Sequence, residues 1–154
     1  MRPLPFDGIV YSGHSYEPFD FTQQAVYRDY AVGQSFTNQV ASIINRDARR
    51  FLRWGQRHDV PLLLGEFGCI GYTDGITEGP SSIEDCGKYA DAVHQAYVQQ
   101  GIGVTWWSLE KEKTIFLRSP SDACSESSQC PIWMPANRVI NPHIAAGLQL
   151  RAVE

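Results

Sequence analysis

The stretch Val60-Pro61-Leu62-Leu63-Leu64-Gly65-Glu66-Phe67-Gly68-Cys69 joins an apolar run to a single carboxylate. The apolar run predicts a β-strand over residues 60–66 that is covered on both faces, as in a parallel sheet. A charge at the end of such a strand is costly to bury unless it is paired. In barrels of alternating strands and helices, residues at the carboxyl ends of strands are typically catalytic. Glu66 is therefore the first candidate for a catalytic residue, and the alternative is a loop acid held by glycine amides.

Two further strand-and-helix units are visible around this strand. Strands are predicted over residues 8–12, ending at His14-Ser15-Tyr16, and over residues 102–108. The spacing of apolar residues predicts a helix over residues 37–54 that Gly55 ends. A capping box at Ser81-Ser82-Ile83-Glu84 predicts the start of a second helix, which ends at Gly101. Strands that alternate with long helices predict an α/β fold with a parallel sheet.

A last helix is predicted from Asn141-Pro142 to residue 150, with asparagine as the N-cap and proline in the first turn. The predicted strand-to-helix links, 17–36, 70–80 and 110–139, are long, whereas the helix-to-strand link over 56–59 is short. The long links therefore gather at the carboxyl ends of the strands, where the active sites of such folds lie.

The composition is that of one ordinary domain. The chain has 154 residues, of which 43% are hydrophobic and 19% charged, and no segment approaches the roughly 20 apolar residues of a transmembrane helix. The net charge is −4 and the basic residues are scattered, which does not favour a nucleic-acid partner. One arginine cluster has helical spacing and is interpreted as a solvated helix face: Arg46, Arg49, Arg50 and Arg53. The N-terminus lacks the apolar region of a signal peptide.

The four cysteines favour at least one disulfide. Cys124 and Cys130 flank a short polar loop, and we expect them to be bonded to each other. Cys69 and Cys86 could pair or stay free. The spacing fits none of the zinc-binding patterns. A disulfide predicts an extracellular or periplasmic location.

The ends of the predicted strands carry a consistent set of side chains. His14 and Tyr16 are two residues apart, so an extended strand points both to the same side. Both can donate hydrogen bonds to the Glu66 carboxylate, which would hold it in place as a nucleophile. Trp106 and Trp107, at the third strand end, offer a flat apolar face for a sugar ring. Taken singly, a structural histidine and core tryptophans are the alternatives.

In this order, His14-Ser15-Tyr16, Gly65-Glu66-Phe67-Gly68 and Trp106-Trp107-Ser108-Leu109-Glu110-Lys111 resemble the last three strands of the glycoside hydrolase family 5 cellulase barrel. The resemblance covers about residues 8–112 and the final helix. It implies a partial (β/α)8 TIM-type barrel of about three parallel βα units, in a single domain over residues 1–154.

The resemblance also implies a function. It is that of a glycosidase similar to endo-β-1,4-glucanase, which hydrolyses β-linked glucan or a related polysaccharide by a retaining mechanism. Glu66 matches the nucleophile, and His14 and Tyr16 match residues that line the site. Trp107 is a better match than Trp106 for the tryptophan that supports the sugar. No metal or cofactor is implied.

One element of the family pattern has no counterpart. The family's acid/base follows an asparagine at the end of the fourth strand, and the residues before 8 leave no room for that strand. A retaining mechanism needs a second carboxyl about 5–5.5 Å from the nucleophile. Glu17 and Glu110 lie nearest to strand ends among the candidates, which are Glu17, Asp20, Asp74, Glu110 and Glu112. The alternatives are a carbohydrate-binding fragment and a purely structural barrel fragment, both without turnover.

A three-stranded portion of a barrel also predicts association. Its sheet would have two open edges and an inner face without the opposite strands that normally pack it. We expect a homo-oligomer, most simply a twofold dimer.

Overall fold

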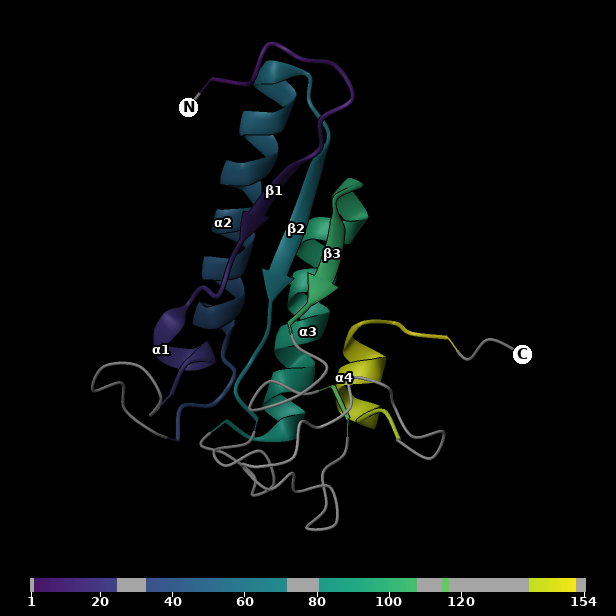
Figure 1. Cartoon of the computed structure of the whole chain (residues 1–154). Coiled ribbons are helices and arrows are strands. Elements are labelled where there is room, and N and C mark those ends of the chain that lie inside the picture. Colours follow the sequence, from purple (N-terminus) through teal and green to yellow (C-terminus); the bar gives the residue numbers. More distant parts are fainter. Residues whose placement is uncertain (1, 25–32, 72–80, 108–114, 117–138, 152–154) are drawn as a thin grey trace, which may run out of the picture.

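A computed structural model describes residues 2–24, 33–71, 81–107, 115–116 and 139–151 of the chain. Its centre is a three-stranded parallel sheet in the order β1-β2-β3. The strands are β1 (Tyr11–His14), β2 (Leu62–Phe67) and β3 (Gly103–Trp106). All three run in the same direction, so their carboxyl ends meet at one edge of the sheet (Figure 1). This arrangement confirms the predicted α/β fold of parallel βα units.

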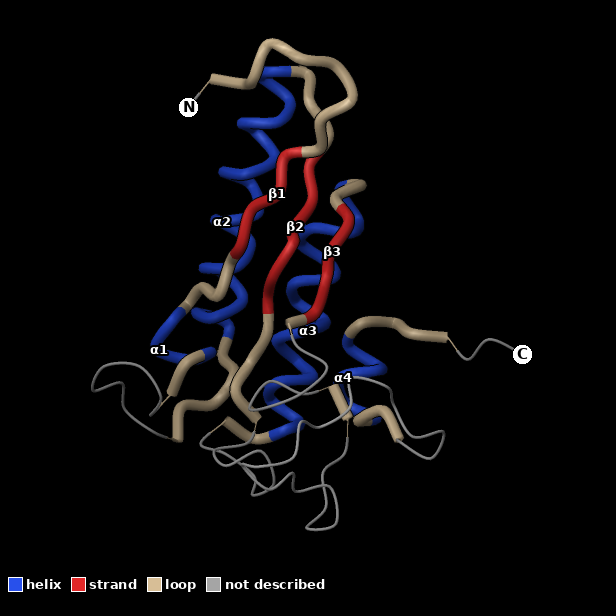
Figure 2. Tube along the Cα trace, in the orientation of Figure 1, coloured by secondary structure: helices blue, strands red, loops and turns tan. Residues whose placement is uncertain are grey.

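Helices connect the strands. α2 (Asn38–His58) leads from β1 to β2, and α3 (Ile83–Tyr97), extended by η1 (Val98–Gln100), leads from β2 to β3. Figure 2 shows α2 and α3 on the same side of the sheet. Two short helices complete the described part: α1 (Phe19–Thr22) follows β1, and α4 (Pro142–Gly147) packs against α3. The sequence did not predict α1, which is a single turn within the long link after β1.

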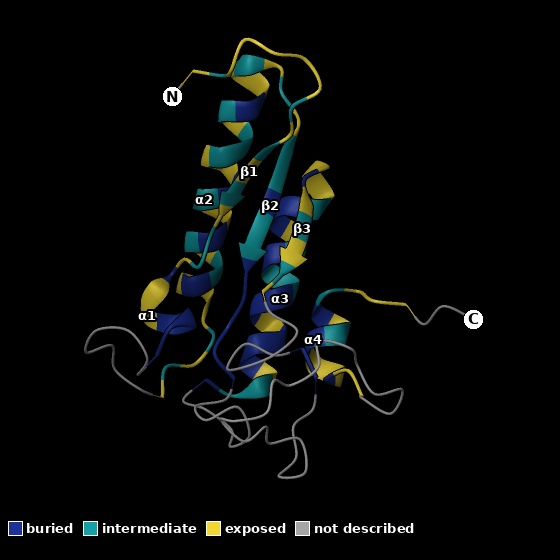
Figure 3. Ribbon diagram, viewed as in Figure 1, coloured by how far each residue is buried: buried dark blue, intermediate teal, exposed yellow. Residues whose placement is uncertain are grey.

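The hydrophobic core lies between the sheet and the two long helices, α2 and α3. Leu64 and Phe67 of β2 are 2% and 0% exposed, and they belong to one cluster with residues from α2 and α3. The contributing helix residues include Val40, Ile44 and Ala48 of α2 and Tyr89, Val93 and Tyr97 of α3. The opposite face of α2 is largely exposed, whereas α3 is buried along most of its length and α4 packs against it (Figure 3). The arginines of the predicted solvated face are all exposed on α2.

The end of α2 differs from the prediction. The helix continues through Gly55 to His58, and the following residue, Asp59, caps it in a left-handed conformation with φ of 52°. Gly55 is buried, and a Cβ atom at that position would lie 2.6 Å from Cδ1 of Leu62. The glycine therefore serves close packing of the helix on β2, whereas the chain reversal is made by Asp59.

The start of α3 also differs by one residue. Ser82 is the N-cap, and its hydroxyl accepts a hydrogen bond from the Asp85 amide at 3.0 Å. Ser81, which the predicted capping box placed at the cap, is fully buried and donates to the Phe21 carbonyl. Glu84 instead forms an ion pair with Lys88. The predicted cap at Asn141 is confirmed, because its side chain accepts from the amides of His143 and Ile144.

The sequence predicted that the leucine run of β2 is covered on both faces of the sheet, and the structure differs. Leu64 is buried in the core and Leu62 packs on Gly55 of α2. Only Leu63 lies on the other face, where its side chain contacts the Gly103 position of β3. The remaining side chains of that face are small or polar, because Ser12 and Thr105 alternate with the core-facing residues of their strands. The large apolar surface expected there is therefore mostly absent.

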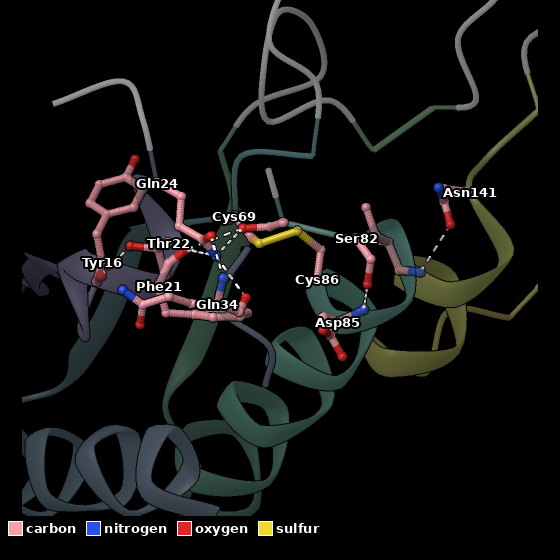
Figure 4. Close-up of a disulfide and its surroundings, with 12 residues drawn as sticks. Tyr16, Phe21, Thr22, Gln24, Gln34, Cys69, Ser82, Asp85, Cys86 and Asn141 are labelled. Carbon is pink, nitrogen blue, oxygen red and sulfur yellow. Dashed lines mark hydrogen bonds between the residues drawn. A yellow bond between two sulfur atoms is a disulfide. The ribbon is translucent and has the colours of Figure 1, made fainter. Parts of the chain in front are cut away.

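A disulfide links Cys69 to Cys86, which resolves the alternative that the sequence left open. It joins the segment after β2 to the first turn of α3 (Figure 4). The predicted disulfide between Cys124 and Cys130 lies outside the described residues. Among the helices that are described, none has the length and apolar character needed to cross a membrane.

Candidate active site

The carboxylate of Glu66 lies at the carboxyl end of the central strand, with 26% of its side chain exposed. The hydroxyl of Tyr16 donates a hydrogen bond to its Oε2 atom at 3.0 Å. Nδ1 of His14 lies 3.4 Å from the same oxygen. Within the described residues no partner is found for Oε1. Oε2 of Glu66 is thus held by β1 and its extension.

A shift in strand register brings His14 opposite Glu66. Gly13 is paired with Leu64, but the next residue, His14, is paired with Glu66 and not with Gly65. The irregularity between Gly13 and His14 places the imidazole and the carboxylate on the same face of the sheet. The Ser15 amide then donates to the Glu66 carbonyl at 3.0 Å, which continues the pairing past the end of β1.

The segment after Tyr16 is tied to the rest of the fold. The Thr22 hydroxyl donates to the Tyr16 carbonyl, and the Thr22 carbonyl accepts from the Ile70 amide at 3.1 Å (Figure 4). The buried Gln24 side chain donates to the Ser81 hydroxyl at 2.9 Å and accepts from the Gln34 amide at 2.8 Å. These bonds fix the chain that carries Tyr16 against the start of α3, next to the disulfide.

The two tryptophans at the end of β3 have different surroundings. Trp106 packs edge-on against Phe67, with ring centroids 5.2 Å apart, on the core side of the sheet. Trp107 is 51% exposed, and its amide donates to the Phe67 carbonyl at 2.7 Å. Only Trp107 therefore has the accessible ring that sugar binding needs, whereas the predicted contact through Trp106 has no support in its position.

Among the residues that the structure describes, no second carboxylate contacts Glu66. Glu17 is exposed, and it makes no hydrogen bond or ion pair with another described residue. Asp20 is also exposed, in the single turn of α1. Asp74, Glu110 and Glu112 lie outside the described residues. The residue ranges that can be described also contain no group of three or more His, Cys, Asp or Glu side chains placed to hold a metal ion.

Sequence reasoning missed two side chains next to the site. Ser15 lies between His14 and Tyr16, and its hydroxyl contacts Asp47 on α2. A signal for Asp47 was available, because it is a carboxylate on the apolar side of an amphipathic helix, three residues after Ile44 and four before Phe51. Its partners could not be foreseen, because they come from other elements.

The fold and the site together define a portion of a (β/α)8-type barrel with a carboxylate at the end of a central strand. The chain belongs to glycosyl hydrolase family 5, since the family described as Cellulase (glycosyl hydrolase family 5) matches residues 2–113. This confirms the family indicated by the sequence. No curated protein matches the chain closely enough to count as a relative.

Solved structures show the same fold at low sequence identity. An endoglucanase superposes with a TM-score of 0.70 at 20% identity, over 96% of this chain and 42% of its own. The cellulose synthase subunit Z (CcsZ) of Clostridioides difficile gives 0.71 at 18%, over 96% and 43%. Cel5A of Thermotoga maritima, solved with mannotriose, gives 0.70 at 14%, over 96% and 42%. The chain thus spans about two fifths of the length of these structures.

Proposed function

We propose that this chain carries the nucleophile of a cellulase-type glycosidase that hydrolyses β-linked glucan with retention of configuration, and that Glu66 is that nucleophile. The observation that carries the proposal is the unequal environment of its two oxygens. Oε2 accepts from Tyr16 and faces His14, while Oε1 has no partner among the described residues. Membership of glycosyl hydrolase family 5 supports the same class of reaction.

The proposed reaction has two displacements. Oε1 of Glu66 attacks the anomeric carbon, the bond to the leaving-group oxygen breaks, and that oxygen takes a proton from a general acid. Water then attacks the same carbon, loses its proton to the conjugate base of that acid, and frees the Glu66 carboxylate. Tyr16 and His14 act by holding Oε2, so that the carboxylate cannot rotate and Oε1 stays directed at the sugar.

Trp107 is proposed to support the sugar ring next to Glu66. Its exposed indole follows β3, whose neighbour in the sheet is β2, the strand of Glu66. An aromatic ring offers a large flat surface that a pyranose can cover without losing its own hydrogen bonds to water. The substrate class that fits this surface beside a carboxylate is a β-linked glucan or a related polysaccharide.

The general acid is proposed to come either from this chain or from a second copy of it. Glu17 and Glu110 are the candidates within it, and the mechanism requires one of them to come within about 5–5.5 Å of Glu66. A homodimer could supply a carboxylate from the other copy. Association as such is supported by exposed apolar residues at the amino-terminal side of β1, the end opposite Glu66: Leu4, Phe6 and Val10. Light scattering at micromolar concentration should give about twice the chain mass of 17.3 kDa, and a stable monomer would contradict the dimer.

We also propose an oxidising location, extracellular or periplasmic. The support is the disulfide between Cys69 and Cys86, because disulfides persist mainly in such compartments.

The experiment that tests the proposed function separates nucleophilic attack from acid catalysis. Dinitrophenyl β-cellobioside has a leaving group that needs no protonation, so release of dinitrophenolate in the first displacement requires the nucleophile but not the general acid. We expect the purified chain to release dinitrophenolate and Glu66→Gln to lose that activity by about a thousandfold or more. The control is Glu84→Gln, which removes an exposed carboxylate on α3.

Two results would count against the proposal. Near wild-type release by Glu66→Gln would remove Glu66 from the mechanism. Binding of cello-oligosaccharides without any release would favour the alternative of a carbohydrate-binding fragment.

A further inference from the structure

A carboxylate on α2 contacts the strand end that carries the two side chains facing Glu66. The Ser15 hydroxyl donates to Oδ2 of Asp47 at 2.6 Å. Along an extended chain successive side chains point to opposite sides, so Ser15 points toward the helices while His14 and Tyr16 point toward Glu66. Asp47 therefore holds this strand end from the side opposite to the candidate site.

A second hydroxyl reaches the same oxygen of Asp47. The Tyr97 hydroxyl, at the end of α3, donates to Oδ2 at 3.0 Å, and Tyr97 is 1% exposed. Burial, with the charge of Asp47 as the second cause, raises the pKa of Tyr97, so the phenol keeps the proton that it donates. Asp47 is itself half-buried, and no basic side chain is paired with it in the described ranges. Within the described residues, both contacts of its carboxylate are neutral hydroxyl donors from other elements.

The main chain of Ser15 is held as well. Its amide donates to the Glu66 carbonyl at 3.0 Å, so the residue is fixed on one side by β2 and on the other by Asp47. The residues on either side of Ser15 both contact Oε2 of Glu66. A displacement of Ser15 would therefore move both contacts of Oε2 together.

We propose that Asp47 is a positioning residue: through Ser15 it sets where His14 and Tyr16 meet the Glu66 carboxylate. A role of Asp47 in catalysis rests on the proposed function of Glu66. Its role in positioning His14 and Tyr16 does not depend on that function. Nothing in the chain's apolar pattern needs a carboxylate on this side of α2, and its two hydroxyl partners explain why one is present.

The two hydroxyl contacts of Asp47 allow a matched pair of variants. Ser15→Ala removes the hydroxyl that belongs to the strand end carrying His14 and Tyr16, and Tyr97→Phe removes the hydroxyl on α3, which also neighbours Ser15. Each deletes one hydroxyl from the same carboxylate oxygen, so both should lower the thermal stability. Only Ser15→Ala and Asp47→Ala should change the site. Asp47→Asn keeps the size and an acceptor oxygen, so it should retain most of the wild-type behaviour. If Asp47→Ala does not fold, Ser15→Ala tests the proposal by itself.

A spectroscopic readout tests the geometry without any turnover. In protein labelled at histidine, the imidazole resonances of His14, assigned with His14→Gln, should shift when Glu66 is replaced by Gln. We expect that response to be largely lost in the Ser15→Ala and Asp47→Ala backgrounds and preserved in the Tyr97→Phe background. A response of His14 that survives in Ser15→Ala and Asp47→Ala would overturn the inference.

Kinetics with dinitrophenyl β-cellobioside test the consequence for catalysis. Ser15→Ala should lower kcat by about tenfold or more, since small misplacements of reacting groups are costly. KM should change by less than about twofold, because the sugar contacts are unchanged. Equal losses in Ser15→Ala and Tyr97→Phe would show a structural role only and overturn the proposal. If the wild-type chain releases no dinitrophenolate, the proposed function fails and the histidine resonances alone decide the inference.

Discussion

Tyr16 donates its hydroxyl to Oε2 of Glu66 at 3.0 Å across 50 residues of sequence. The contact joins the extension of β1 to the end of β2, and it exists because the sheet pairs these two strands in parallel. It makes the two oxygens of Glu66 inequivalent. The two oxygens of a carboxylate that contacted only water would be equivalent.

Removal of the Tyr16 hydroxyl should therefore impair the site. A hydrogen bond to a charged group contributes about 1.5–3 kcal/mol, so Tyr16→Phe should lower kcat on dinitrophenyl β-cellobioside by about tenfold to a hundredfold. Tyr11→Phe is the control, because the Tyr11 hydroxyl accepts from the Leu4 amide at the opposite end of β1. Equal activities of Tyr16→Phe and the wild type would mean that the contact does not orient the carboxylate.

The disulfide between Cys69 and Cys86 should contribute measurably to stability. It closes a loop with a sequence separation of 17, for which the chain-entropy relation gives about 3 kcal/mol. The double variant Cys69→Ala/Cys86→Ala should lose about that much free energy of unfolding in urea. If the predicted Cys124–Cys130 disulfide is present, a reducing agent will destabilise the double variant further. No change in the urea midpoint of the double variant would contradict a structural role for the Cys69–Cys86 bond.

Stability should fall above pH 10 because of two buried phenols. Burial raises the pKa of Tyr97 above its ordinary 10.0, and burial also raises that of Tyr89. In the unfolded chain both ionise near pH 10, so above that pH the folded state binds more protons and the free energy of unfolding decreases. Each phenol should contribute a slope of up to about 1.4 kcal/mol per pH unit.

Urea unfolding at pH 9 to 12 would measure that slope. We expect Tyr97→Phe to be less stable at neutral pH, where it lacks the bond to Asp47, and to show a shallower decline above about pH 10. Parallel declines in the variant and the wild type would show that Tyr97 ionises equally in both states.

Gly55 should not tolerate a methyl group although it lies within a helix. Alanine is favoured over glycine in helices by about 1 kcal/mol. Its Cβ would, however, lie 2.6 Å from Cδ1 and 2.7 Å from Cγ of Leu62, and overpacking costs about 1–3 kcal/mol. We expect Gly55→Ala to be net destabilising, and to become neutral or stabilising in a Leu62→Ala background. Ser42→Ala, at an exposed position of α2, is the control, and a stabilising Gly55→Ala in the wild-type background would contradict the packing argument.

The spacing of apolar residues and the capping residues at helix ends predicted the architecture well. The buried run before Glu66 and the apolar spacing of the two long helices depend on local pattern, and the parallel sheet follows from their alternation. Gly55 misled because glycine is used both to end helices and to allow close packing, and only the position of Leu62 distinguishes the two. The choice of cap between Ser81 and Ser82 depended in the same way on Phe21, which is distant in sequence.

The candidate site was predicted in its residues but not in its connections. Glu66, His14 and Tyr16 were found from their places at strand ends, and the structure brings them together. The preference for Oε2, the register shift after Gly13 and the role proposed for Asp47 depend on contacts between elements. Asp47 meets its partners at separations of 32 and 50 residues, which no local pattern encodes.

Covalent trapping tests the identity of the nucleophile most directly. A dinitrophenyl 2-deoxy-2-fluoro-β-cellobioside slows hydrolysis of the glycosyl ester, so the ester accumulates on the attacking residue. Mass spectrometry of the digested protein should find the sugar on the peptide that contains Glu66, and the adduct should be absent from Glu66→Gln. An adduct on another carboxylate, or its persistence in Glu66→Gln, would contradict the assignment of Glu66 as the nucleophile.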